Sequence, residues 1–130
     1  MKRTAALAAL LFSALLSSSA QTATQIAPTV AGIWALAYDV ATLSIKMSCT
    51  VTQADGKLAG TCTGDDKVPH DLTGEVNGQA VTFKFNKTFS GSQITDTFTA
   101  PQGMDATGTM KGTMSVTPMN VNGTFTVTKQ

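Results

Sequence analysis

Apolar and polar residues alternate along most of this chain in short segments, and this two-residue period constrains the fold more than any other feature. From residue 43 to 52 the odd positions are apolar, and the even positions are Thr, Ser or Lys. Because side chains alternate between the two faces of a β-strand, such a segment has one core face and one solvent face. Similar alternation recurs at residues 81–89 and 104–114. We therefore expect an all-β protein.

Turn-forming residues divide these segments into about eight strands. The turn signals are Asp55-Gly56, Asn77-Gly78, Ser90-Gly91-Ser92-Gln93 and Pro101-Gln102-Gly103, with polar breaks at 65–69 and 117–120. A one-sided antiparallel meander of this length is best stabilised by closing on itself, which removes its edges. The sequence predicts a single eight-stranded antiparallel up-and-down β-barrel. The tight turns at Asp55, Asn77 and Pro101 lie at a narrow end, opposite an open end.

The first residues have the pattern of a secretory signal peptide. Lys2 and Arg3 precede an apolar run at residues 5–16, and small residues follow at 18–20. We expect residues 1–20 to be a signal peptide, 21–30 a flexible leader and 31–130 the barrel domain, in a periplasmic or secreted protein without a membrane span. Beyond residue 20 there is no arginine and the lysines nearly balance the acids, which argues against a nucleic-acid partner.

The two cysteines fit this fold. If Asp55-Gly56 is a two-residue turn, Cys49 lies directly opposite Cys62 on the neighbouring strand, and both side chains face the core. Such neighbours lie within disulfide range, and export supplies an oxidising compartment. We therefore predict a Cys49–Cys62 disulfide. With His70 as the single histidine, the sequence offers no metal-binding set.

A charge interrupts the apolar stripe of two successive strands. Lys87 breaks the stripe at residues 81–89, and Asp96 breaks the stripe at 94–100. With Gly91-Ser92 as the turn, Lys87 faces Asp96 inside the barrel, and Phe85 faces Phe98. The turn segment is permissive, however, and a shift by one residue would dissolve this pair.

Other registers place further residues near these charges. Asn77-Gly78 as the turn sets His70 opposite Phe85, and a three-residue loop at 101–103 sets Asp96 opposite Gly108. Two interpretations stay open: the polar groups orient a ligand in an apolar pocket, or an ion pair fixes the register without a ligand. The ligand-binding candidates are Tyr38, His70, Lys87, Asp96, Phe85 and Phe98.

Four short motifs resemble those of a known barrel family. They are Gly32-Ile33-Trp34, Gly56-Lys57-Leu58-Ala59-Gly60-Thr61, Leu72-Thr73-Gly74 and Gly123-Thr124-Phe125-Thr126. Together they resemble lipocalin and avidin-like barrels of the calycin type. This resemblance implies a cup for a small ligand, with Gly32 and Trp34 as structural residues and Trp34 plugging the closed end. The single tryptophan argues against a biotin site.

A second resemblance is to periplasmic metalloprotease inhibitors, which are similar barrels with one disulfide and an N-terminal trunk. This resemblance implies that residues 21–30 could be such a trunk. We expect an exported binding protein for a small apolar or amphiphilic molecule or for an exported protein, without cofactor or metal. The alternatives are a protease inhibitor and a small isomerase-like enzyme using Lys87 and Asp96. Otherwise we do not expect an enzyme, because no hydroxyl has an activating sequence context.

Overall fold

The structure, a computed structural model, describes residues 29–130 as eight β-strands joined by turns and loops. The strands are β1 (Gly32–Val40), β2 (Leu43–Ala54), β3 (Lys57–Thr63), β4 (Pro69–Asn77), β5 (Ala80–Phe89), β6 (Ser92–Ala100), β7 (Thr109–Thr117) and β8 (Val121–Lys129). The predicted signal peptide and residues 21–28 of the predicted leader lie outside the described residues. From residue 29 onward, no helix has the length and apolar character that crossing a membrane requires.

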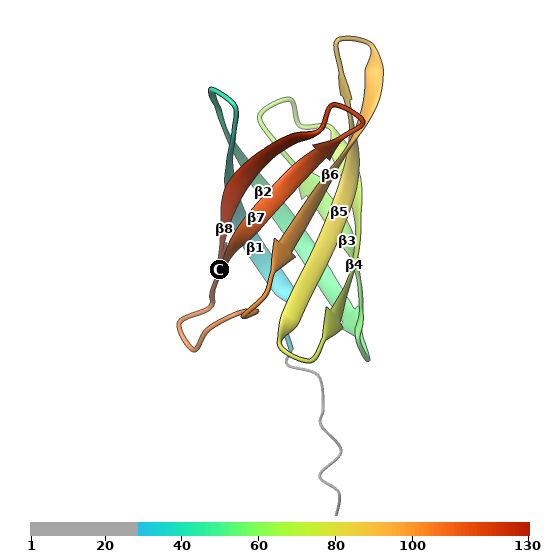
Figure 1. The fold of residues 1–130 in the computed structure, drawn as a ribbon. Coiled ribbons are helices and arrows are strands. Elements are labelled where there is room, and N and C mark those ends of the chain that lie inside the picture. Colours follow the sequence, from blue (N-terminus) through green and yellow to red (C-terminus); the bar gives the residue numbers. More distant parts are fainter. Residues whose placement is uncertain (1–28) are drawn as a thin grey trace, which may run out of the picture.

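The strands form one closed barrel (Figure 1). Each strand pairs antiparallel with the next along the chain, and β8 returns to pair with β1. The all-β fold class and the eight-stranded up-and-down barrel are thus confirmed. The turns β1–β2, β3–β4, β5–β6 and β7–β8 lie at the upper end in Figure 1, which we call the open end. The β5–β6 hairpin extends farthest there.

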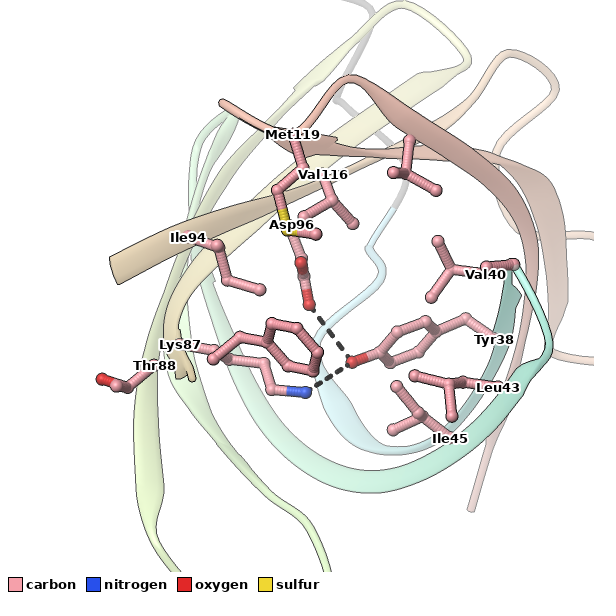
Figure 2. A pocket seen from close by; sticks show the side chains of 13 residues that line it. Tyr38, Val40, Leu43, Ile45, Lys87, Thr88, Ile94, Asp96, Val116 and Met119 are labelled. Atoms are coloured by element: carbon pink, nitrogen blue, oxygen red, sulfur yellow. Dashed lines mark hydrogen bonds between the residues drawn. The ribbon is translucent and has the colours of Figure 1, made fainter. Parts of the chain in front are cut away.

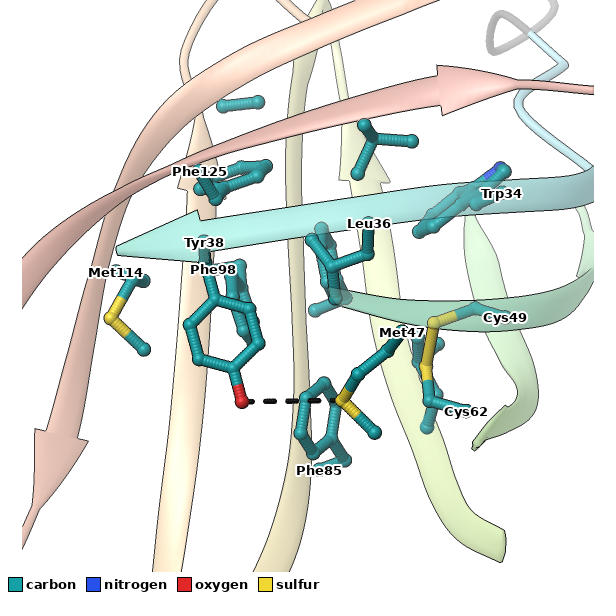
Figure 3. Packing of buried hydrophobic residues seen from close by; sticks show 14 of the residues in the cluster. Trp34, Leu36, Tyr38, Met47, Cys49, Cys62, Phe85, Phe98, Met114 and Phe125 are labelled. Atoms are coloured by element: carbon teal, nitrogen blue, oxygen red, sulfur yellow. Dashed lines mark hydrogen bonds between the residues drawn. A yellow bond between two sulfur atoms is a disulfide. The ribbon is translucent and has the colours of Figure 1, made fainter. Parts of the chain in front are cut away.

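Aromatic rings fill the middle of the barrel. Phe83 and Phe98 stack with ring centroids 4.7 Å apart, and Phe125 meets both edge-on. Tyr38 packs edge-on against Phe98, with centroids 5.2 Å apart (Figure 3). These inward positions are the apolar members of the alternating pattern, and each fully buried ring stabilises the fold by about 2 kcal/mol. The barrel is therefore a packed core along its middle, not an open tube.

Trp34 closes the end opposite the open end. Its side chain is fully buried, its ring meets Phe83 at 5.2 Å, and its indole N–H donates to the Val30 carbonyl at 2.8 Å. Val30, the last residue of the predicted leader, is also buried, and its N–H donates to Gln53 Oε1 at 2.8 Å. The chain just before β1 is thereby fastened against this end of the barrel.

The disulfide prediction is confirmed. Ala54 pairs with Lys57 across the Asp55-Gly56 turn, and this register places Cys49 opposite Cys62. Their sulfurs are bonded and their Cα atoms are 4.0 Å apart (Figure 3). Both side chains are fully buried in the core, so the bond joins β2 to β3 from inside the barrel.

The predicted register between β5 and β6 is wrong, because the turn lies one residue earlier in the chain than expected. Phe89 pairs with Ser92, so the turn is Ser90-Gly91 and not Gly91-Ser92. Ser90 and Gly91 have φ values of 50° and 80°, and two successive positive values match the favoured two-residue hairpin turn. As a result Lys87 faces Ile94, and Asp96 faces Phe85. Phe98 faces Phe83.

The turn between β4 and β5 is also displaced by one residue. Asn77 pairs with Ala80, which makes Gly78-Gln79 the turn. Gly78 has a φ of 64°. The second favoured type of two-residue hairpin turn requires a positive φ at its first central position, which glycine adopts readily. Leu72, and not His70, therefore lies opposite Phe85.

The connection between β6 and β7 is longer than the predicted three-residue loop. It spans residues 101–108, and β7 begins only at Thr109. Asp105 shapes this loop, because its Oδ1 accepts hydrogen bonds from the Thr107 and Thr109 backbone N–H groups, both at 2.9 Å. In the resulting register Asp96 faces Val116 and not Gly108.

Candidate functional site

A pocket of about 200 Å³ lies at the open end of the barrel (Figure 2), and we call it the cup. Most of its lining is aliphatic or aromatic. The apolar lining residues are Val40, Ala41, Leu43, Ile45, Phe89, Ile94, Val116, Met119 and Val121. Leu43, Phe89 and Met119 are each about half exposed and lie at or beside three different hairpin turns around the rim. The cup is therefore apolar from its rim inward.

Three polar side chains meet in the cup, and we call them the polar trio: Tyr38, Lys87 and Asp96. The Lys87 ammonium donates a hydrogen bond to the Tyr38 hydroxyl at 3.0 Å, and this hydroxyl donates to Asp96 Oδ2 at 3.2 Å. Figure 2 shows both bonds converging on the tyrosine oxygen. The hydroxyl thus links the two opposite charges, which the sequence had predicted to face each other directly.

The register explains why the trio assembles although Lys87 and Asp96 are not paired. Lys87 faces Ile94, two residues before Asp96 on β6, so the two charges are diagonal neighbours on the inner face. Diagonal neighbours are within reach of long side chains. Tyr38 reaches them from β1, across the barrel, and its ring lies 5.7 Å from the Lys87 Nζ.

Asp96 is the electrostatic centre of the site. It is 2% exposed and is the only charged residue in the buried set of residues 29–130. Its Oδ1 is buried and has no hydrogen-bond partner. Burial raises the pKa of Asp96, while Lys87, the Tyr38 hydrogen bond and His70 oppose this rise. Burial and the nearby Asp96 also raise the pKa of Tyr38, so its hydroxyl stays protonated and acts as the donor.

His70 lies outside the cup. Its Nδ1 is 3.0 Å from the Asn86 carbonyl oxygen, and it lines a separate, more polar hollow of about 190 Å³ beside the β3–β4 loop. Asp65 and Asp66 also line this hollow, and Lys87 stands between it and the cup. Among residues 29–130 there is no cluster of three or more His, Cys, Asp or Glu side chains placed to bind a metal ion.

The two predicted phenylalanines lie beneath the cup. Phe85 and Phe98 are buried in the core, with ring centroids 5.3 Å apart. Of the six predicted ligand-binding residues, the structure brings Tyr38, Lys87 and Asp96 together in the cup. Val40 and Ile94 were missed as wall residues, although each lies two positions from a trio member toward the open end. Following the inward-facing positions of β1 and β6 two residues further toward the open end would have identified them.

No protein-family model matches the chain, and no curated protein matches its sequence. The support for a lipocalin-like barrel is the architecture: a closed antiparallel barrel of eight strands with a pocket at one end.

Proposed function

We propose that this protein is an exported, lipocalin/avidin-like binding protein that holds a small apolar or amphiphilic molecule in the cup. The observation that carries the proposal is an apolar pocket with a convergent polar group at its inner end. Pockets of this kind commonly bury the apolar part of a ligand and orient it by a few polar contacts. The internal disulfide and the signal-peptide pattern support export to the periplasm or the exterior.

Blocking the cup tests this proposal. Val121 lines the cup from β8, so we expect Val121→Trp to fill it. The matched control is Asn122→Trp, because Asn122 is exposed and lines a hollow on the barrel's outer face. The neutral fluorescent probe N-phenyl-1-naphthylamine is titrated into each protein. We expect wild type and the control to bind the probe and Val121→Trp to bind at least about tenfold more weakly.

Native mass spectrometry of protein purified gently from its own host complements the titration. A stoichiometric small-molecule adduct that is present on wild type and lost from Val121→Trp would identify the natural occupant. Probe binding that is equal in all three proteins would place the binding surface elsewhere and contradict the proposal. Absence of binding would favour a protein partner, with the leader and loops as the first segments to test.

A further inference from the structure

The polar trio leaves hydrogen-bonding capacity unused inside the cup. Lys87 uses one of its three N–H donors on Tyr38, and the single proton of the Tyr38 hydroxyl goes to Asp96 Oδ2. Asp96 Oδ1 is buried and accepts no hydrogen bond. An unpaired buried carboxylate oxygen is costly, because it has lost water and gained nothing in return. The site therefore offers one strong acceptor and two spare donors.

The trio is also balanced in charge. Lys87 and Asp96 are the charged residues that line the cup, and they have opposite signs. A ligand carboxylate would meet the Asp96 carboxylate, and a ligand amine would meet the Lys87 ammonium, in each case among apolar side chains. Like charges in such surroundings repel strongly, since little water screens them. A head group without charge avoids both penalties.

The donor residue and the acceptor residue are linked through one atom, the Tyr38 hydroxyl oxygen. Lys87 Nζ lies 3.0 Å from the Tyr38 hydroxyl oxygen, and Asp96 Oδ2 lies 3.2 Å from the same atom. A hydroxyl can donate its proton to Asp96 Oδ1 while its oxygen accepts from Lys87. A primary amide can do the same with its nitrogen and its oxygen.

We infer, building on the proposed function, that the cup selects an aliphatic molecule with an uncharged head group that both donates and accepts a hydrogen bond, namely an alcohol or a primary amide. The tail lies against the aliphatic wall and the head group satisfies Asp96 Oδ1. Fatty acids and alkyl amines of the same length are disfavoured.

A series with one tail and different head groups tests the inference. Octane, 1-octanol, octanamide, octanoate and octylamine compete at neutral pH with bound N-phenyl-1-naphthylamine on wild-type protein. We expect 1-octanol and octanamide to bind about tenfold tighter than the other three compounds, because they alone pair the free oxygen without bringing a charge. Tightest binding by octanoate or octylamine would overturn the inference and leave the proposed function standing.

Two variants separate a ligand contact from a purely structural role of the trio. In Lys87→Met/Asp96→Leu the cup becomes fully apolar, so the preference for 1-octanol over octane should disappear while octane still binds. In Asp96→Asn the amide oxygen can still accept from Tyr38, but the free oxygen becomes an NH₂ donor and Lys87 loses its counter-charge. The order of 1-octanol and octanoate should then reverse.

The outcomes are distinguishable. If both variants keep the wild-type order of head groups, the trio is structural and the inference is wrong. If the double variant does not fold, as judged by near-ultraviolet circular dichroism, the reversal in Asp96→Asn decides. If neither the probe nor any octyl compound binds wild type, the proposed function fails and this inference with it.

Discussion

Asp96 is the residue at which folding and the proposed binding oppose each other. A carboxylate that is almost fully buried, with one oxygen unpaired, lowers the stability of the empty barrel. The Tyr38 hydroxyl and the Lys87 charge recover only part of this cost, because burial still raises the pKa of Asp96. The proposed ligand would relieve this cost by completing the hydrogen bonds of Asp96.

The pH dependence of stability should report this cost. The raised pKa means that the folded chain binds the Asp96 proton more tightly than the unfolded chain, whose pKa stays near 3.8. This residue therefore favours folding most below its unfolded pKa, and the advantage is lost as pH rises through the folded pKa. Asn resembles the protonated carboxyl, and the pKa stays raised even with Lys87 nearby, so we expect Asp96→Asn to be more stable than wild type at neutral pH by about 1 kcal/mol, with a smaller gain near pH 4.

Urea denaturation of both proteins from acid to neutral pH measures the effect. Asp71→Asn, an exposed change on β4, is the control and is measured over the same pH range. A stability difference between wild type and Asp96→Asn that does not vary with pH would contradict the expected titration of Asp96.

The sequence predicted which residues form the trio better than how they meet. Lys87 and Asp96 stand out because each is a charge on an otherwise apolar stripe, and such a stripe must face the core. The direct pairing failed because the residues from Ser90 to Gln93 admit more than one turn, and the backbone selects the one with successive positive φ values. The cup's extent was not predictable either, since it depends on where the packed aromatic rings end.

At the scale of the elements, the close approach of paired strands depends on positions without a side chain. Gly112 on β7 lies against the backbone of β6, where an added Cβ would overlap the Thr99 carbonyl oxygen. Backbone atoms on a paired strand cannot move aside as a flexible side chain can. The close approach allows the strands to coil into a small barrel. Alternation places Gly112 on the inner face, but the contact itself needs the three-dimensional register.

A side chain at this close contact should strongly lower the stability of the barrel. We expect Gly112→Ala to lower the free energy of unfolding by about 2 kcal/mol or more, because two paired strands must separate locally. Thr113→Ala, at the next and exposed position, is the control and should change it by less than about 1 kcal/mol. Chemical denaturation followed by tryptophan fluorescence measures both, since Trp34 is buried in the core. Equal effects would contradict the steric argument.

Element boundaries followed the sequence at the Asp55-Gly56 turn and failed where a side chain built the connection. Asp55-Gly56 fixed the β2–β3 register and with it the disulfide. Between β6 and β7 the apolar alternation continues through Met104 and Ala106, so the sequence predicted a strand there. Asp105 instead accepts hydrogen bonds from nearby backbone N–H groups and holds the segment in a loop.

At the scale of the whole molecule, closure leaves the barrel without strand edges, and the disulfide adds a covalent link inside it. Cys49 and Cys62 are separated by 13 positions, so the bond restricts a short loop of the unfolded chain. A loop of this size stabilises by about 3 kcal/mol in the chain-entropy description. Small barrels depend on such links because they bury a modest fraction of their surface.

Reduction should therefore weaken the folded barrel. We expect a reducing agent to lower the unfolding free energy of wild type by about 3 kcal/mol in urea denaturation. Cys49→Ala/Cys62→Ala is the control, because it should be destabilised already and should not respond to the reducing agent. Wild-type stability that is unchanged after reduction, with both thiols shown to be free, would contradict this role of the disulfide.

The filled middle of the barrel has a kinetic consequence. Stacked aromatic rings lie beneath the cup and Trp34 closes the far end, so a molecule in the cup has no route through the barrel axis. An occupant that entered by the rim has to leave by the rim before a second one can take its place. Exchange then proceeds at the rate of release, however high the concentration of competitor. For the proposed binding function, the residence time of the bound molecule, more than the supply of new ligand, would set how quickly one occupant replaces another.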